Sequence, residues 1–402
     1  MVEYDLSSIN GINAAEIFSD NNTDNIDKLK LIHKHWIQND KPYNILKYDR
    51  KNITYDMFDS TGLFRSVIYS NKKINVFSPP KALNISVFIN KYKAEDCVVE
   101  EFIEGTMINL FYDSDVEKWE IASKSSIGGN VTFFKDQPTF SDLFYDVCNE
   151  LKIDFANFSK EYCYSFIMQH PKNKFVRQIN EKKLYLITCY KIDNNTYKVT
   201  EIPRHFHTYT YENMSFPEFN NFESFNELLD KYGSMNTNCN IMGVVIHHKS
   251  GIRTKIRNPN YEYLKHLRGN SSKLQYQYLC LRKMGQVKDN LRFFPDNKAQ
   301  FKVFKIQLHM FTDNLYTNYI KCYMKKDKPL TEFPKQFRTH MFNLHKYYLY
   351  IKPYGGYINK SVVINYINNL DSAKLMYSLN FHLRDAVQID QNTANMVVEE
   401  VS

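Results

Sequence analysis

The sequence predicts an α+β fold followed by an all-helical C-terminal domain. Two observations carry this prediction. Between residues 63 and 246, short apolar runs are separated by Asn, Asp, Pro and Gly, which is typical of strands in antiparallel sheets. After Pro259, apolar residues instead recur at helical spacing. At 402 residues the chain is long enough for two domains, and we place them at 1–260 and 261–402.

The individual elements follow from the same patterns. A helix is predicted around Asp24–Gln38, and a second one begins after Thr139, whose hydroxyl can cap it, and runs toward Leu151. Strands are predicted at Ser66–Ser70, Ile74–Ser78, Val98–Phe102, Thr106–Tyr112, Trp119–Ala122, Cys163–Met168, Leu184–Tyr190 and Met242–Ile246. Helices of the second domain are predicted at 261–284, 297–325, 335–351 and 360–384.

Composition limits the class of protein. A hydrophobic content of 43% is enough for real cores, and mean hydropathy is −0.51. No run reaches about 18 apolar residues, so no membrane span and no membrane partner are expected. The 7 cysteines form no Cys-x-x-Cys pair, which argues against a zinc knuckle or a disulfide framework. A reducing, cytoplasmic compartment is therefore expected.

The net charge of +8 is unevenly distributed. Residues 251–350 hold 20 Lys and Arg against 6 Asp and Glu, with tyrosines interleaved among them. This pattern is typical of proteins that bind a polyanion such as a nucleic acid, in which lysines and arginines contact phosphates and aromatic rings stack on bases. Two other interpretations stay open: a solvated helical face whose tyrosines lie in the core, and lysine enrichment from an AT-rich genome.

The segment Phe102-Ile103-Glu104-Gly105-Thr106 has the frame of a nucleotidyl-transfer site without its nucleophile. Six further segments accompany it in a fixed order. They are Phe64–Tyr69, Phe77–Asn84, Ser123–Ile127, Phe166–Val176, Ile241–Ile246 and Thr254–Tyr261. The series resembles the T4 RNA ligase 1-like family of covalent nucleotidyltransferases. The resemblance implies a ligase-type nucleotidyltransferase domain (ATP-grasp-like) with antiparallel sheets, followed by a helical domain that engages RNA.

Three positions that carry chemistry in that family hold apolar residues here. Phe102 stands where the family has its nucleophilic lysine, and Ile167 and Met242 stand where it has glutamates. Without the amine there is no lysyl-nucleotide intermediate, and without the carboxylates Mg²⁺ loses its oxygen ligands. We therefore expect no catalytic residue and no magnesium site here. The three side chains line an open pocket or, if the pocket has closed, fill a core.

The basic positions of the family are retained, and the resemblance implies that they bind nucleotide or phosphate. They are Arg65, Lys81, Lys124, Lys255 and Arg257. Glu104 matches the family's ribose contact. Lys255 and Arg257 alternate along one predicted strand and so share a face, although plain surface charges would also fit. Two histidine pairs, His205-x-His207 and His247-His248, lack a third ligand at metal spacing, so no metal site is expected there.

These observations predict a catalytically inactive ligase-like protein that binds ATP, another nucleotide or an RNA end. RNA is the expected partner, with a protein complex as a further one. One alternative is an active ATP-dependent RNA ligase in which a displaced lysine (Lys93, Lys118 or Lys124) supplies the amine. Another is a scaffold subunit whose old pocket is filled. The composition resembles that of proteins from large DNA viruses or phages, which would place the chain in the host cytoplasm.

Overall fold

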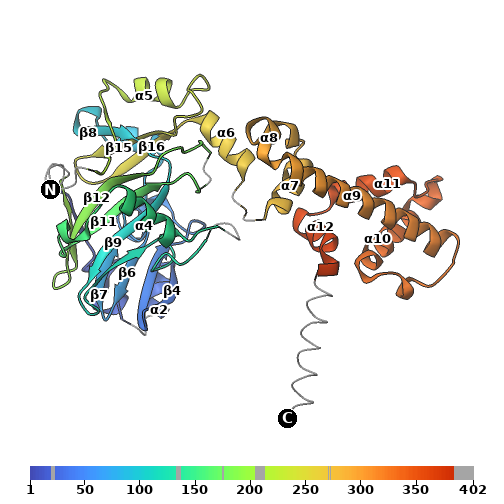
Figure 1. Cartoon of the computed structure of the whole chain (residues 1–402), viewed down its shortest axis with the longest axis horizontal. Coiled ribbons are helices and arrows are strands. Elements are labelled where there is room, and N and C mark those ends of the chain that lie inside the picture. Colours follow the sequence, from blue (N-terminus) through green and yellow to red (C-terminus); the bar gives the residue numbers. More distant parts are fainter. Residues whose placement is uncertain are drawn as a thin grey trace, which may run out of the picture. The chain divides into compact units, whose positions relative to one another are not determined.

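The structure is a computed structural model that describes residues 1–19, 23–132, 137–173, 176–203, 213–269, 271 and 273–383 (Figure 1). The chain divides into two compact units, Met1–Tyr263 and Leu264–Ser402. The predicted class is confirmed, because antiparallel sheets build the first unit and helices follow. The functional assignment of 1–260 and 261–402 stays a prediction. His205 and His207, and Lys174 and Phe175 of one ligase-like segment, lie outside the described residues.

The largest sheet of the first unit has six antiparallel strands in the order β1-β13-β12-β11-β9-β10. Their bounds are Glu3–Asp5, Lys198–Ile202, Lys183–Asp193, Tyr162–Gln169, Thr106–Asp113 and Lys118–Ala122. Helix α4 (Phe140–Glu150) packs in the same core through Phe144, beside Phe166 of β11. Thr139 begins this helix in a reciprocal capping box with Asp142, which confirms the predicted cap.

A four-stranded sheet, β4-β5-β6-β7, shares a core with the six-stranded sheet. Its strands are Leu31–Gln38, Lys41–Tyr48, Val67–Ser70 and Lys73–Phe77. The predicted helix Asp24–Gln38 is wrong beyond Lys28: α2 covers Thr23–Lys28 only, and after a turn at 29–30 the chain forms strand β4. Asn39 and Asp40 explain the error, since both have positive φ and close a two-residue hairpin between β4 and β5.

A second four-stranded sheet, β14-β8-β15-β16, carries the segment Phe102–Thr106 directly after β8. Its strands are Phe219–Asn220, Cys97–Glu101, Gly243–His248 and Arg253–Arg257. Helices α3 (Ile85–Lys91) and α5 (Phe225–Tyr232) share its core through Phe88 and Leu228. The remaining short elements of the unit are β2 Ser8–Ile9, β3 Ile12–Asn13, α1 Ala14–Ile17, η1 Tyr55–Met57, η2 Thr61–Leu63, η3 Ala94–Asp96 and η4 Phe155–Asn157.

The chain after Pro259 is helical, as predicted. Its α-helices are α6 Pro259–Arg268, α7 Leu274–Lys283, α8 Val287–Phe293, α9 Lys298–Tyr319, α10 Lys335–Ile351, α11 Lys360–Asn369 and α12 Ser372–Leu379. The shorter turns are η6 Pro295–Asn297, η7 Ile320–Met324 (a π-helical turn), η8 Leu330–Glu332 and η9 Lys352–Tyr354. The predicted helices 261–284 and 360–384 are each two helices: α6 ends at Arg268 before α7 begins at Leu274, and Asp371 caps a new helix at α12. Within the described ranges, no helix is long and apolar enough to cross a membrane.

Candidate functional site

Two glycines allow the chain segments around Phe102 to pack closely. Phe102 follows β8, and its N–H donates to the carbonyl of Gly243 at 3.1 Å. A Cβ on Gly105 would collide with the side chain of Ile167, and one on Gly243, at φ +127°, would collide with the carbonyl of Ile256. The chain therefore keeps the close backbone approach of the motif, while its central side chain is a ring without a nucleophile.

A small cavity lies beside the Phe102 ring. Its volume is about 60 Å³, and its described lining includes Arg65, Ile167 and Lys255. Ligand pockets typically exceed about 300 Å³, so this cavity is too small for a nucleotide. Met242 is half-buried just before β15 and is not among the lining residues described. Phe102 and Ile167 thus line one small cavity, and apolar side chains form much of its wall.

Two carboxylates from β8 also line this cavity. Glu100 is buried, with its Oε2 3.4 Å from the Nε2 of His247. Burial, followed by the charge of Glu218, raises the pKa of the Glu101 carboxyl. Sequence reasoning did not count these groups in the pocket. The space beside Phe102 is therefore of mixed charge.

Two of the three basic residues of β16, Lys255 and Arg257, flank the ring. The Lys255 Nζ lies 3.8 Å from the centroid of the Phe102 ring, and the guanidinium carbon of Arg257 lies 5.8 Å from it. Arg257 is exposed and donates to Glu262 at 3.0 Å. Both cations sit on one strand face, as the alternation predicted, and both contact the ring in the geometry of a cation–π pair.

The Glu104 side chain is hydrogen-bonded to other residues of the first unit. Its side chain is buried, and its carboxylate accepts the N–H of Val176 at 2.7 Å, the N–H of Arg177 at 3.2 Å and the hydroxyl of Tyr261 at 2.7 Å. Its backbone carbonyl accepts the Gln169 side-chain amide at 2.7 Å. Both carboxylate oxygens therefore have partners, and Oε2, which among the described residues accepts only the Arg177 N–H, keeps one acceptor site for the implied ribose contact.

The remaining predicted cations gather elsewhere, around a buried tyrosine at the end of β5. The Lys124 Nζ lies 5.1 Å from the Tyr48 ring centroid and the Lys81 Nζ 5.8 Å from it. Arg50 and Arg65 are close enough for their charges to act on Lys124. We call Tyr48, Arg50, Arg65, Lys81 and Lys124 the Tyr48 cluster. Arg65 also lines the Phe102 cavity, so it joins the two parts of the site.

Main-chain hydrogen bonds bring these distant segments together. The N–H of Tyr48 donates to the carbonyl of Phe64 at 2.6 Å, and that of Lys81 donates to the carbonyl of Gly62 at 3.0 Å. The loop after β10, which presents Lys124, is held on the other side by the Lys47 Nζ, 2.8 Å from the Ser125 hydroxyl.

A buried arginine holds the two prolines that precede Lys81. The guanidinium of Arg253 on β16 donates to the carbonyls of Pro79 and Pro80 at 2.6–3.0 Å. The N–H of Leu83 donates in turn to the Arg253 carbonyl at 2.8 Å. The segment around Lys81 is therefore anchored to the sheet that carries Phe102.

The electrostatics of the Tyr48 cluster are those of crowded cations. Burial, then the charges of Arg50, Arg65, Lys47 and Lys81, lower the pKa of Lys124 to about 8. Burial and then Arg253 lower the pKa of Arg65 to about 10. Burial and Arg50 also lower the pKa of Lys81.

No carboxylate in the described part of the chain lies within 4.0 Å of a charged nitrogen of these four cations. Like charges held together without counter-charges are costly, and an anion relieves that cost. Across the ranges that the structure describes, there is likewise no group of three or more His, Cys, Asp and Glu that could hold a metal ion.

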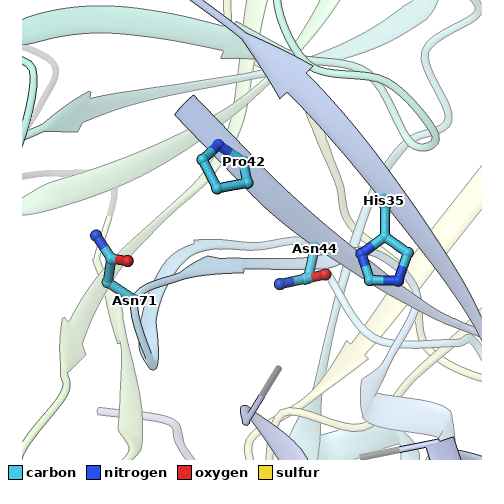
Figure 2. Close-up of a pocket in the computed structure, with 4 residues that line it drawn as sticks. All are labelled: His35, Pro42, Asn44 and Asn71. Atoms are coloured by element: carbon cyan, nitrogen blue, oxygen red, sulfur yellow. The ribbon is translucent and has the colours of Figure 1, made fainter. Parts of the chain in front are cut away.

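A larger cavity of about 220 Å³ lies along β4 and β5. Figure 2 shows its four lining residues, His35, Pro42, Asn44 and Asn71. None of these described lining residues is a lysine or arginine, so the described part of the wall offers a phosphate no fixed positive charge. Size alone therefore does not locate the candidate site, and the charge distribution favours the Tyr48 cluster.

Sequence reasoning identified part of this site. It named Arg65, Lys81 and Lys124, which the fold gathers, but grouped them with Lys255 and Arg257, which the fold places at the Phe102 ring. It missed Tyr48 and Arg50. The available signal was a tyrosine at the end of a predicted strand followed by an arginine, which is too common to single out.

No protein-family model matches the chain. Over 283 residues the chain is 26% identical to the immediate-early protein ICP-46 homolog of Invertebrate iridescent virus 3, and the match covers 67% of the chain. The chain spans 58% of the length of that curated relative, whose name states no activity.

The solved structures that the chain resembles include ATP-dependent RNA and DNA ligases. One is an archaeal ATP-dependent RNA ligase, form 2, at 13% identity and a TM-score of 0.42, covering 67% of this chain and 71% of that one. Another is a putative ATP-dependent DNA ligase from Aquifex aeolicus, at 13% identity and 0.38, covering 70% and 69%. A mutant Naegleria gruberi RNA ligase with ATP and Mn follows at 10% and 0.34, covering 61% and 82%. At these scores the likeness carries nothing about activity.

Proposed function

We propose that the first unit binds the phosphates of a nucleotide or of an RNA end at the Tyr48 cluster, without covalent nucleotidyl transfer at Phe102. The observation that carries the proposal is the set of four cations around Tyr48 that lack a carboxylate partner among the described residues. ATP is the first ligand to test, because the sequence resemblance implies it. The viral relative makes the cytoplasm of an infected cell the proposed compartment.

The chemistry of the cluster supports a phosphate ligand. Lysine and arginine donate charge-assisted hydrogen bonds to phosphate oxygens, and these bonds are stronger than neutral ones. A bound phosphate would supply the counter-charge that Lys81 and Lys124 lack and would raise their lowered pKa values.

The space at Phe102 supports binding without covalent transfer there. A phenyl ring cannot attack an α-phosphate. The cavity beside it, at about 60 Å³, does not admit a nucleotide as it stands. The Lys255 ammonium, which could otherwise neutralise an α-phosphate, lies over the ring.

Binding of ATP and of pyrophosphate to the full chain, measured by calorimetry, tests the proposal. We expect Lys81→Gln and Lys124→Gln each to weaken binding by about tenfold or more, the effect of one charge-assisted contact. Lys91→Gln, at a lysine of α3 outside the cluster, is the matched control and should bind as the parent does. If neither ligand binds the parent chain at low salt, the proposal fails.

A second candidate function, an active ligase with a displaced lysine, is favoured by one observation. The pKa of Lys124 is lowered to about 8, so a substantial share of its amine is neutral near physiological pH. Its Nζ would form a bond to the α-phosphorus of ATP while the bond to pyrophosphate breaks and the amine loses a proton. After incubation with α-labelled ATP, a band on a denaturing gel that Lys124→Arg abolishes would establish this alternative, since arginine keeps the charge and lacks the nucleophile.

The small volume at Phe102 also leaves a scaffold subunit as a candidate. In that case the full chain would bind neither ATP nor pyrophosphate and would purify in a stoichiometric protein complex. Substitutions in the Tyr48 cluster would then leave that complex unchanged.

A further inference from the structure

We propose that the end of α10 in the second unit is a stacking platform for single-stranded RNA. The platform consists of Tyr350, Tyr354 and Tyr357 together with Lys346 and Lys352. It is separate from the Tyr48 cluster of the first unit. It rests on the proposed function only in taking RNA as the ligand.

The outward face of α10 supplies the first part of the platform. Phe337, Met341 and Leu344 are buried on the inner face of this helix. Tyr350 is 72% exposed and lies one helical turn after Lys346, so both project from the opposite face. A ring and an ammonium group therefore stand side by side on the free surface of the helix.

A tight turn after the helix supplies the other two rings. Gly355 has a φ of +76° and its N–H donates to the carbonyl of Lys352 at 3.0 Å. A Cβ on Gly356 would collide with the side chain of Ile351. These two glycines hold Tyr354 and Tyr357 on either side of a short turn, where they are 83% and 65% exposed.

The three rings do not serve the core of the second unit. None of them contacts another ring in the part of the chain that the structure describes, whereas Tyr348 beside them packs on His345 at 5.7 Å between centroids. Three large aromatic side chains within eight residues (350–357) thus leave their faces in water. Such grouping of exposed aromatic surface marks a binding site more often than a fold requirement.

The charge around the platform selects a polyanion as its occupant. No Asp or Glu occurs between Glu332 and Asp371, while that stretch contains Lys335, Arg338, Lys346, Lys352 and Lys360. Lys346 and Lys352 have no ion pair with any described residue. Exposed rings alternating with lysines that have no carboxylate partner are the arrangement that binds single strands, in which bases stack on the rings and phosphates contact the cations. Paired bases in a duplex do not offer their faces in this way.

A labelled oligouridylate with a 5′ hydroxyl is the probe, measured by fluorescence anisotropy with the full chain. Since this probe has no 5′ phosphate, its binding does not depend on an end-binding site at the Tyr48 cluster. We expect the triple change of Tyr350, Tyr354 and Tyr357 to Ala to weaken binding by roughly tenfold or more, the loss of at least one stacked base. The triple change to Phe should bind as the parent does. Val303→Ala with Met310→Ala, at exposed apolar positions of α9, is the matched control and should have no effect.

Salt dependence gives a second readout that does not rely on the alanine variants folding. Lys346→Gln and Lys352→Gln should each reduce the slope of log affinity against log salt by about 0.7. Duplex RNA of the same length should bind the parent at least tenfold more weakly. The proposal is overturned if the alanine triple variant folds and binds the oligouridylate like the parent, or if the duplex binds equally well. It is also overturned if the triple change converts a dimer to a monomer in sedimentation, because the rings would then be a contact between two copies.

Discussion

The ammonium of Lys255 lies 3.8 Å from the centroid of the Phe102 ring, so a cation on β16 caps the ring that replaces the expected nucleophile. A lysine at position 102 would place a second cation against Lys255. The phenyl ring instead offers its negative face to that charge. Position 102 therefore packs against a cation and offers no nucleophile.

We predict that Phe102 and Lys255 stabilise the first unit jointly. In a double-mutant cycle with Phe102→Leu and Lys255→Met, the coupling free energy should be about 1 kcal/mol, the value for a partly buried cation–π pair. Urea unfolding followed by tryptophan fluorescence measures it, because both tryptophans, Trp36 and Trp119, lie in the first unit. Coupling indistinguishable from zero would show that the ring and the ammonium are neighbours without an energetic link.

We predict that neutralising Lys124 stabilises the ligand-free protein while weakening its binding of phosphate. Lys124→Gln removes one of several like charges, so the thermal midpoint of the first unit should rise by ~1–2 °C. The same change should lower affinity for pyrophosphate. Lys91→Gln should alter neither quantity. A lower midpoint for Lys124→Gln would mean that Lys124 has a structural role.

The pH dependence of binding should report the Lys124 titration. Its pKa is about 8 in the folded chain, below its ordinary value of 10.5. Affinity for pyrophosphate should therefore fall between pH 7 and 9 as the ammonium loses its proton. Lys124→Arg should remove this fall, because arginine stays charged throughout the range.

Without ligand, the same lowered pKa has the opposite sign for stability. Between pH 8 and 10.5 the unfolded chain holds a proton on Lys124 that the folded chain has lost. The free energy of unfolding contributed by this group therefore rises with pH in that window.

For the binding prediction, a pyrophosphate affinity that stays constant from pH 7 to 9 in the parent chain would exclude Lys124 from the phosphate site.

Much of the fold was predictable because local patterns determine it. Thr139 and Asp142 form the cap that predicts the start of α4, and the helical spacing of apolar residues after Pro259 predicts the second unit. The failure at Leu31–Gln38 is also local, since the Asn39-Asp40 hairpin outweighed the helical periodicity of the segment. Where turn chemistry and periodicity disagree, the turn prevailed here.

The candidate site was less predictable because it depends on strand pairing far along the chain. The sequence resemblance placed Lys124 and Lys255 in one phosphate-binding site. Hydrogen bonds from Tyr48 to Phe64 and from Lys81 to Gly62 join distant segments, and the fold places Lys124 at Tyr48 and Lys255 at Phe102. Such distances in sequence leave no periodic signal.

Finally, Glu104 should act as a structural anchor of the first unit. Its buried carboxylate accepts two backbone N–H groups and the Tyr261 hydroxyl, so Tyr261→Phe removes one charged hydrogen bond and should cost about 1.5 kcal/mol in unfolding free energy. Glu104→Gln should cost more, about 2–3 kcal/mol, because its amide group would turn a donor toward a donating N–H. Urea titration with tryptophan fluorescence measures both, with Tyr55→Phe at an exposed tyrosine as the control. If both changes leave unfolding unaltered while ATP affinity falls, Glu104 contacts the ligand and the hydrogen bonds described above are dispensable for the fold.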